Sequence, residues 1–237
     1  MATTPTVVLV HGAFADASGY GGIIHELEKD GVTVIAPPNP LRSLSGDAAA
    51  LEALVKTIDG PVLLVGHSYG GAVITQASAA LSNVVGLVYV AAFALDVGES
   101  CATAQKGFPA SLLSTSLVPT SYDAPGAPGG PDFYVAKDPF REVFSGDSSE
   151  KDSAILYATQ RPLSGAAYTE VATAAGWKTI PSWFLISEKD HSIPPEFQHA
   201  AAKRGNMTVE TIDGSHTAFI PHHRTAAKFI QTAIAAL

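Results

Sequence analysis

The chain has little that could cross-link it or anchor it in a membrane. Cys101 is the single cysteine among 237 residues, which excludes an internal disulfide framework and a cluster of thiolate metal ligands. No apolar run approaches the roughly 18 residues that a membrane-spanning helix needs. The first six residues hold no Lys or Arg, and the apolar run at residues 7–10 is too short for a secretory signal. We therefore expect a cytoplasmic protein.

Charge is also scarce, and one sign dominates. Charged residues make up 15% of the chain, and 14 Lys and Arg stand against 22 Asp and Glu, a net charge of −8. An acidic surface without a basic run argues against nucleic acid or an anionic membrane as the main partner. The hydrophobic content of 46% excludes a disordered chain and fits a well-covered core. The pattern leaves open whether the protein is a monomer or a homodimer.

What the chain does contain is a series of short β-branched runs that alternate with helical segments. The runs lie at residues 6–10, 32–36, 62–65, 84–90, 183–186 and 209–212. Runs of this length are typical of strands buried on both faces of a parallel sheet. Helical patterns lie between or after them, at residues 18–29, 48–58, 71–81 and 225–237. The alternation predicts an α/β fold with a mostly parallel, doubly wound sheet that binds ligands at the carboxyl ends of its strands.

Residues 94–181 interrupt this alternation. They hold no clear buried strand, and residues 119–131 carry four of the 16 prolines. Because the segment is too long for a bare loop, we expect a small, mainly helical cap. The cap would be an insertion into one domain, residues 1–237, whose core is residues 1–93 and 182–237. Residues 122–131 are the most mobile candidate within it.

One motif points to nucleophilic catalysis. Gly66-His67-Ser68-Tyr69-Gly70 follows a strand-like run and precedes a helix-like segment. A nucleophile on a sharp strand-to-helix turn needs small residues two before and two after it, because the two backbones approach too closely for a Cβ atom. Ser68 is therefore the candidate nucleophile, although a glycine-rich turn without chemistry would share the pattern.

A serine needs a base to take its proton and a carboxylate to orient that base, in the chain order Ser, Asp, His. His216 is the candidate base, since it begins the loop between the last strand and the last helix. Asp190 follows the run at residues 183–186 and is the preferred acid, with Asp96 as the alternative. We interpret Asp213 as a turn former.

The remaining histidines have other interpretations. His67 adjoins the nucleophile across a tight turn and is expected to pack, while His222 and His223 are expected to be solvated. Together with His199, these last two lack the spacing of metal ligands.

An acyl-transfer site also needs two donors aimed at the developing oxyanion. The backbone N–H groups of Ala13 and Tyr69 are the candidates, because one follows the first strand and the other follows the nucleophile. Phe14 is the candidate substrate contact. The other candidates for pocket lining are Tyr69, Phe108, Leu112, Leu113, Phe133 and Phe140, for each of which core packing is an equal alternative.

Together these residues resemble an α/β-hydrolase of the serine esterase type. The segments that carry the resemblance, in the family's order, are His11-Gly12-Ala13, Gly66-His67-Ser68-Tyr69-Gly70-Gly71, Ala91-Ala92-Phe93, Asp190 and Gly214-Ser215-His216. The nine residues from Asp190 to Gln198 are similar to a segment of plant-type methylesterases and hydroxynitrile lyases. That subgroup has a compact sheet and a small cap, and the resemblance implies no metal and no organic cofactor.

Differences between this sequence and those of related enzyme classes narrow the predicted activity. The lyases place a hydroxyl residue after the first-strand histidine and a lysine beside the catalytic histidine, where this chain has Gly12 and Thr217. Haloalkane dehalogenases and epoxide hydrolases use an aspartate at the position of Ser68. The resemblance thus implies a serine hydrolase that cleaves small carboxylic esters through an acyl-enzyme. A binding or receptor protein with a retained triad, a C–C bond hydrolase or lyase, and a cofactor-free haloperoxidase remain alternatives.

Overall fold

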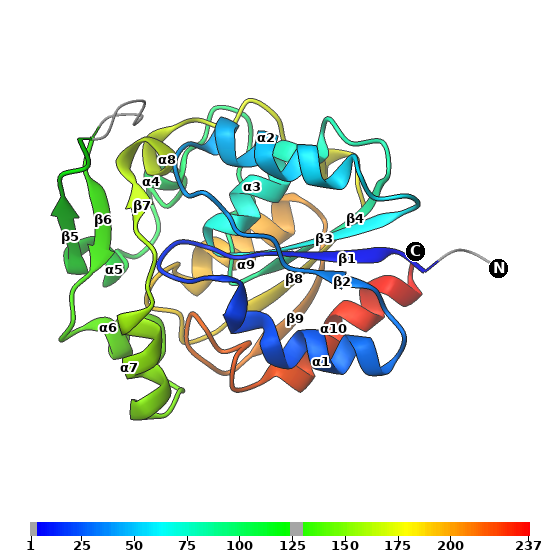
Figure 1. Cartoon of the computed structure of the whole chain (residues 1–237). Helices are drawn as coiled ribbons and strands as arrows, with labels where there is room; N and C mark the ends of the chain where they lie inside the picture. Colours follow the sequence, from blue (N-terminus) through cyan, green and yellow to red (C-terminus); the bar gives the residue numbers. More distant parts are fainter. Residues whose placement is uncertain (1–3, 124–129) are drawn as a thin grey trace.

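A six-stranded parallel sheet forms the centre of the molecule, with the strand order β2-β1-β3-β4-β8-β9 (Figure 1). The structure is a computed structural model that describes residues 4–123 and 130–237. The strands are β1 (Thr6–Val10), β2 (Val34–Ile35), β3 (Val62–His67), β4 (Val84–Val90), β8 (Ser182–Ser187) and β9 (Thr208–Ile212). Each predicted run overlaps one of these strands, and the mostly parallel sheet is confirmed.

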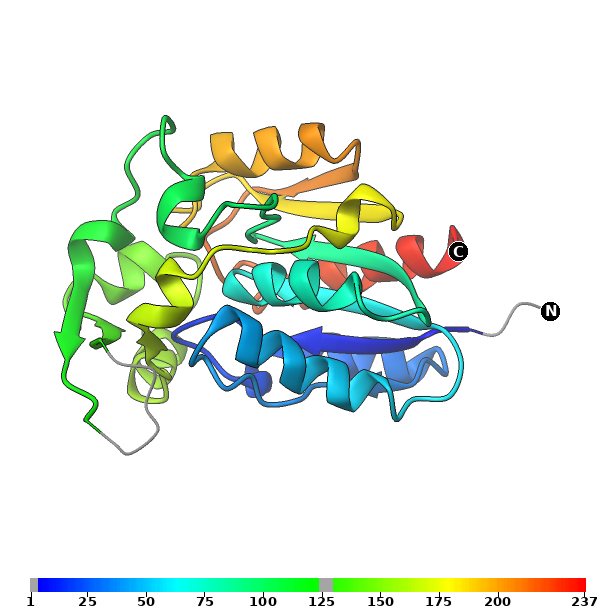
Figure 2. The ribbon, with the colours of Figure 1, turned by 90° about the horizontal axis from the view of Figure 1, so that it is seen from above.

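Helices cover both faces of the sheet (Figures 1 and 2). One face carries α2 (Leu44–Val55), α3 (Tyr69–Ser78) and α9 (Pro195–Arg204), and the other carries α1 (Gly21–Lys29) and α10 (His223–Ala235). A 3-10 turn, η1 (Ala17–Tyr20), leads into α1. The sequence patterns did not predict α9, whose four buried residues are Phe197, the polar Gln198 and two alanines. In the described part of the chain, no helix is long and apolar enough to cross a membrane.

The order of the strands sets the position of the site. From β1 the chain builds outward to β2 on one side and through β3, β4, β8 and β9 on the other. In such a sheet the carboxyl ends of the strands meet at one edge, and ligands bind where the strand order reverses. The loops after β1, β3, β8 and β9 therefore converge.

Most of the inserted segment lies over this edge of the sheet, at the left of Figure 1. Its elements are α4 (Cys101–Ala104), α5 (Leu113–Ser116), β5 (Leu117–Thr120), β6 (Asp132–Val135), α6 (Phe140–Phe144), α7 (Glu150–Ala158), β7 (Leu163–Ser164), α8 (Gly165–Thr169) and the 3-10 turn η2 (Gly176–Lys178). Most of these are helical, as expected. Part of the segment predicted to be most mobile, residues 124–129, lies outside the described residues.

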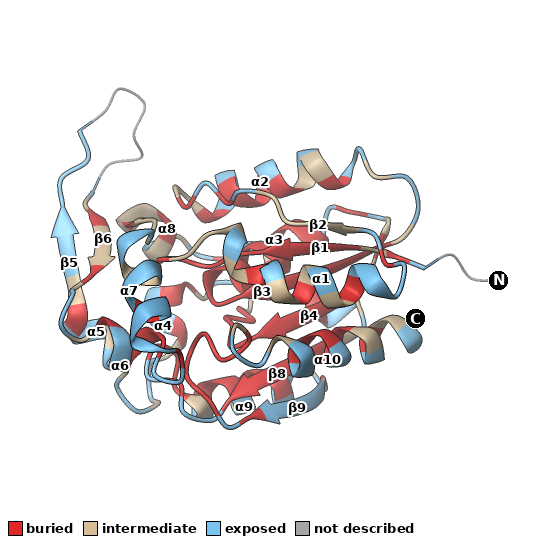
Figure 3. Cartoon of the chain, turned by 60° about the horizontal axis from the view of Figure 1, so that its bottom comes forward, coloured by how far each residue is buried: buried red, intermediate tan, exposed pale blue. Residues whose placement is uncertain are grey.

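The cap also contains a small antiparallel sheet, β5-β6-β7, which the sequence patterns did not predict. Its strands have two to four residues, and three of the four residues of β5 are exposed (Figure 3). Strands this short, with one of them largely exposed, do not produce the apolar run that identifies a buried strand.

Three of the contacts that join the cap to the core lie at the loop after β1 and at the segment before α2. The guanidinium of Arg42 lies 2.9 Å from a carboxylate oxygen of Asp132 on β6. The Ser164 amide donates to the Leu41 carbonyl at 3.0 Å, and the Phe14 amide donates to the Arg161 carbonyl at 2.9 Å. The cap is therefore joined to the loop after β1 and to the segment before α2.

The packing of α10 against the sheet gives a direct test of the fold. Ile230 is fully buried in α10, whereas Ile155 in α7 is 52% exposed. We expect Ile230→Ala to lower the free energy of unfolding by about 2–5 kcal/mol, because it removes buried methyl groups and leaves a cavity. The matched control Ile155→Ala should change it by less than about 0.5 kcal/mol. Urea denaturation measures both, and equal effects would contradict this packing.

Candidate active site

Ser68 occupies a strained turn between β3 and α3. Its backbone has φ 54° and ψ −124°, a conformation that residues with a side chain rarely adopt. The Ser68 carbonyl accepts hydrogen bonds from Gly71 at 3.0 Å and from Phe93 at 3.1 Å, and the Ser68 amide donates to Val90 at 3.3 Å. Neighbouring backbone thus holds the turn on both sides.

Glycines make this turn possible, because three stretches of backbone meet there. A Cβ atom at Gly66 would lie 2.6 Å from the Gly70 carbonyl oxygen, and one at Gly70 would overlap the Val10 carbonyl oxygen. A Cβ atom at Gly12 would lie 2.6 Å from Ser68 Cβ and 3.1 Å from Ser68 Oγ. Positions 66 and 70 therefore have no room for a side chain, as the motif predicted. The loop after β1 lies directly against the Ser68 side chain.

His216 and Asp190 form a buried pair on the neighbouring loops. His216 lies between β9 and α10, Asp190 follows β8, and His216 Nδ1 is 2.7 Å from Asp190 Oδ2. Both side chains are excluded from solvent. Since a carboxylate only accepts hydrogen bonds, Nδ1 carries the proton, and Nε2 is left as the basic nitrogen.

Three further donors fix the Asp190 carboxylate. The Ser192 and Ile193 amides donate to Oδ1 at 2.7 and 2.9 Å, and the Gln198 side chain on α9 donates to Oδ2 at 2.9 Å. Gln198 is fully buried, and its amide oxygen accepts from the Ser187 amide at 3.2 Å. The sequence patterns did not assign a role to Gln198, because its contact with Asp190 depends on how α9 packs.

The alternative acids lie elsewhere. Asp96 is partly exposed and pairs with Lys178. Asp213 is 76% exposed at its side chain and lies 2.8 Å from Lys189 Nζ. Of the three carboxylates considered, Asp190 is the one that contacts His216 within the described residues.

His67 packs behind the pair. Its ring centroid lies 4.6 Å from those of both His216 and Phe219, and its Nε2 donates to the His216 carbonyl at 3.0 Å. Burial, together with repulsion from a charged His216, lowers the pKa of His67 well below its ordinary value. His67 therefore stays neutral and supports the loop that carries His216.

The other histidines named from the sequence lie apart from this pair. The side chains of His199 and His222 are each about half exposed, at 49% and 48%, and His223 begins α10. Across residues 4–123 and 130–237, no three His, Cys, Asp or Glu side chains converge as metal ligands would.

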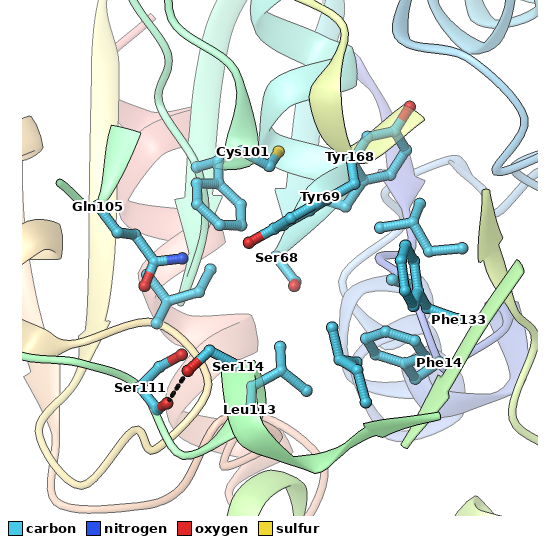
Figure 4. Close-up of a pocket in the computed structure, with 15 residues that line it drawn as sticks. Phe14, Ser68, Tyr69, Cys101, Gln105, Ser111, Leu113, Ser114, Phe133 and Tyr168 are labelled. Atoms are coloured by element: carbon cyan, nitrogen blue, oxygen red, sulfur yellow. Dashed lines mark hydrogen bonds between the residues drawn. The ribbon is translucent and has the colours of Figure 1, made fainter. Parts of the chain in front are cut away.

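A cavity opens over Ser68 beneath the cap (Figure 4). Its space, mouth and adjoining open solvent included, is about 530 Å³. The residues that line it are Ala13, Phe14, Ser68, Tyr69, Phe93, Cys101, Gln105, Ser111, Leu113, Ser114, Leu117, Phe133, Leu163, Tyr168 and Ile193. None of these side chains is Asp, Glu, Lys, Arg or His. The Cys101 thiol is buried, and burial raises its pKa, so it is not a thiolate.

The predicted lining residues divide into two groups. Phe14, Tyr69, Leu113 and Phe133 line the cavity. The other three do not, because their packing takes them elsewhere: Phe108 stands edge-on to Phe197 at 5.6 Å, Leu112 is 41% exposed, and Phe140 packs on Phe144 at 5.2 Å. Gln105 and Tyr168 were not predicted, since nothing in a sequence shows which cap residues face inward.

Two backbone amides lie beside Ser68 without a protein acceptor. Tyr69 begins α3, so its N–H has no partner within the helix. In the described residues, the Ala13 amide likewise makes no hydrogen bond to backbone or side chain. The Tyr69 hydroxyl donates to Asp47 at 2.7 Å, which fixes that side chain against α2. Both amides are thus free to bind a ligand next to Ser68.

Comparison with known proteins identifies the family. A profile of the alpha/beta hydrolase family matches residues 7–232. The chain is 31% identical over 233 residues to an alpha/beta hydrolase, nvfD, of Aspergillus novofumigatus, which covers 88% of this chain and 87% of that protein. This chain belongs to the alpha/beta hydrolase family.

Two solved structures share this fold. A pyrethroid hydrolase from Sphingobium faniae JZ-2 superposes with a TM-score of 0.83 at 20% identity, over 99% of this chain and 98% of that one. A methylesterase from Arabidopsis gives a TM-score of 0.82 at 18% identity, over 98% and 100%. The resemblance to methylesterases predicted from the sequence is confirmed at the level of the fold.

The crowding at the turn predicts that adding one methyl group there lowers the free energy of unfolding. We expect Gly66→Ala to lower the free energy of unfolding by about 1–3 kcal/mol or more, since backbone atoms cannot move aside cheaply. At Gly21, the first residue of α1, a Cβ atom would meet nothing within 4 Å, so Gly21→Ala should be neutral or stabilising by up to about 1 kcal/mol. Urea denaturation of both variants checks this, and a neutral Gly66→Ala would contradict it.

The neutral state of His67 predicts a pH dependence of stability. When the chain unfolds, His67 regains its ordinary pKa of 6.5 and takes up a proton that the folded state does not bind. Its contribution is therefore present above pH 6.5 and is lost as the pH falls, by up to about 1.4 kcal/mol per pH unit. His67→Gln keeps a donor near the His216 carbonyl but does not titrate. Urea midpoints between about pH 5.5 and 7.5 should show a shallower slope for the variant, and identical slopes would refute this.

Proposed function

We propose that this chain is a serine carboxylic-ester hydrolase, with Ser68 as nucleophile, His216 as base and Asp190 as the orienting acid. The observation that carries the proposal is the buried 2.7 Å hydrogen bond between His216 Nδ1 and Asp190 Oδ2, on loops that converge with the strained turn at Ser68. A buried pair of this kind leaves Nε2 of His216 as an oriented base.

The reaction follows from these roles. His216 takes the hydroxyl proton of Ser68 as its oxygen attacks the ester carbonyl. The amides of Ala13 and Tyr69 bind the oxyanion that develops, and the fixed Asp190 carboxylate stabilises the imidazolium. His216 then gives its proton to the leaving alkoxide. Water, activated by the same histidine, finally releases the acid from the acyl-enzyme.

The lining of the cavity supports a small, uncharged and partly apolar ester. Phe14, Phe93 and Phe133 contribute aromatic walls, and no charged side chain is present to balance an ionised substrate. A buried charge without a partner is costly, so a charged ester would bind poorly here. The names of the structural neighbours, pyrethroid hydrolase and methylesterase, also support an ester as the substrate.

The proposal is tested by p-nitrophenyl acetate turnover. We expect Ser68→Ala to lower kcat by about 10³-fold or more, and Asp190→Asn to lower it by a comparable factor because the wrong tautomer of His216 is then favoured. The measurement is the initial rate of p-nitrophenolate release.

The matched control is Ser78→Ala, another buried serine on α3, whose hydroxyl donates to the Thr75 carbonyl at 3.3 Å. It should keep the unmutated rate within about twofold. Turnover by Ser68→Ala at the level of the unmutated chain would overturn the assignment. An ester panel graded by the size of the acyl and alcohol parts, with Ser68→Ala as the blank, then defines the substrate.

A further inference from the structure

Two of the larger polar side chains of the cap, Gln105 and Tyr168, line the cavity without a partner among the described residues, as does the small hydroxyl of Ser111. Gln105 follows α4 and Tyr168 lies in α8, on either side of the antiparallel sheet in the chain. Both line the cavity that contains Ser68, and Figure 4 shows them around the same space as the nucleophile. Neither side chain makes a hydrogen bond to another described residue, although each is only partly exposed.

Gln105 differs in this respect from every other glutamine in the chain. Each of the other four has its side-chain amide bonded within the protein. Their partners are Thr173 for Gln76, Val135 for Gln160, Asp190 for Gln198 and Asp30 for Gln231. An amide that is partly buried among apolar groups loses free energy unless a partner is found. For Gln105, the open cavity is where that partner would bind.

Of the two tyrosines that line the cavity, Tyr69 has its hydroxyl bonded to Asp47, whereas Tyr168 has no partner among the described residues. The hydroxyls of the three fully buried tyrosines, Tyr20, Tyr69 and Tyr89, are all bonded, to the Val10 carbonyl, Asp47 and Thr75 respectively. The Tyr168 ring packs edge-on against Phe133 at 6.4 Å, which fixes it in the cavity wall. Its hydroxyl has no such partner in the described residues. Burial raises the pKa of Tyr168, so the phenol remains protonated and able to donate at neutral pH.

We infer that Gln105 and Tyr168 form a polar subsite that selects uncharged esters carrying a second oxygen, a ketone or hydroxyl, away from the scissile bond. The inference rests on the proposed function and adds the substrate class to it. A phenol donates, and a primary amide both donates and accepts, so the pair matches an oxygen that is neutral. A carboxylate is disfavoured because no lining side chain is cationic.

The test compares matched substrates on the complete chain. Methyl esters of straight-chain oxo acids, with the ketone placed at successive carbons from the fourth onward, are paired with esters that have CH₂ at the same position. We expect kcat/KM to favour the best oxo ester over its partner. A neutral hydrogen bond contributes about 0.5–1.5 kcal/mol, so Tyr168→Phe and Gln105→Leu should each lower that preference by about 2- to 10-fold.

The controls are Tyr134→Phe and Gln231→Leu, which remove the same groups from residues that do not line the cavity. Both should leave the preference unchanged. The inference is overturned if no oxo ester is preferred, if the two cavity variants keep the preference, or if the controls lower it equally. A fall in the rates of both esters by the same factor also counts against it, since that indicates a purely structural role.

Failure of the proposed function has a separate signature, which is equal turnover by the unmutated chain and Ser68→Ala. In that case the subsite is tested by calorimetric binding of the corresponding N-methyl amides, which need no turnover. Tighter binding of the oxo amide than of its methylene partner, reduced by Tyr168→Phe, supports the subsite, and equal binding refutes it.

Discussion

The close approach of three backbone segments around Ser68 is the constraint on which the rest of the structure depends. The end of β1, the turn after β3 and the start of α3 meet where a single Cβ atom would collide, at Gly12, Gly66 and Gly70. This contact sets the spacing of β1 and β3 and the angle at which α3 leaves the sheet. It also places Ala13 and Tyr69 beside Ser68 in the wall of one cavity. The geometry of the site is therefore a property of the backbone before any side chain contributes.

Behind the turn at Ser68, hydrogen bonds fix the polar side chains of the site in place. Asp190 receives four hydrogen bonds, two of them from the backbone that follows it, and so cannot rotate away from His216. His67 supports the His216 loop from behind. In the proposed mechanism, fixing Asp190 and the His216 loop in this way preorganises the base, so that little reorganisation is needed when charge develops.

The core of this arrangement could be predicted from sequence because its signals are local. Buried parallel strands produce continuous apolar runs, and a strained turn requires glycine at fixed offsets from Ser68. The loops that carry Asp190 and His216 follow from where those strands end. Signals that depend on packing between distant segments were missed: Gln198 reaches Asp190 through the placement of α9, and Gln105 and Tyr168 face Ser68 through the fold of the cap. The same reason explains why Phe108 and Phe140, apolar residues of the same segment, pack away from the cavity.

The hydrogen bond from the Phe14 amide to the Arg161 carbonyl joins the cap to the loop that presents the Ala13 amide. Phe14 itself has a left-handed backbone, with φ 59°, at the point of attachment. The cap is thus not a lid on a hinge, because lifting it would pull on the loop beside the nucleophile. The cap is also bonded to the loops that carry Asp190 and His216, so the segment that shapes the cavity and the loops of the proposed catalytic residues are mechanically coupled through several hydrogen bonds.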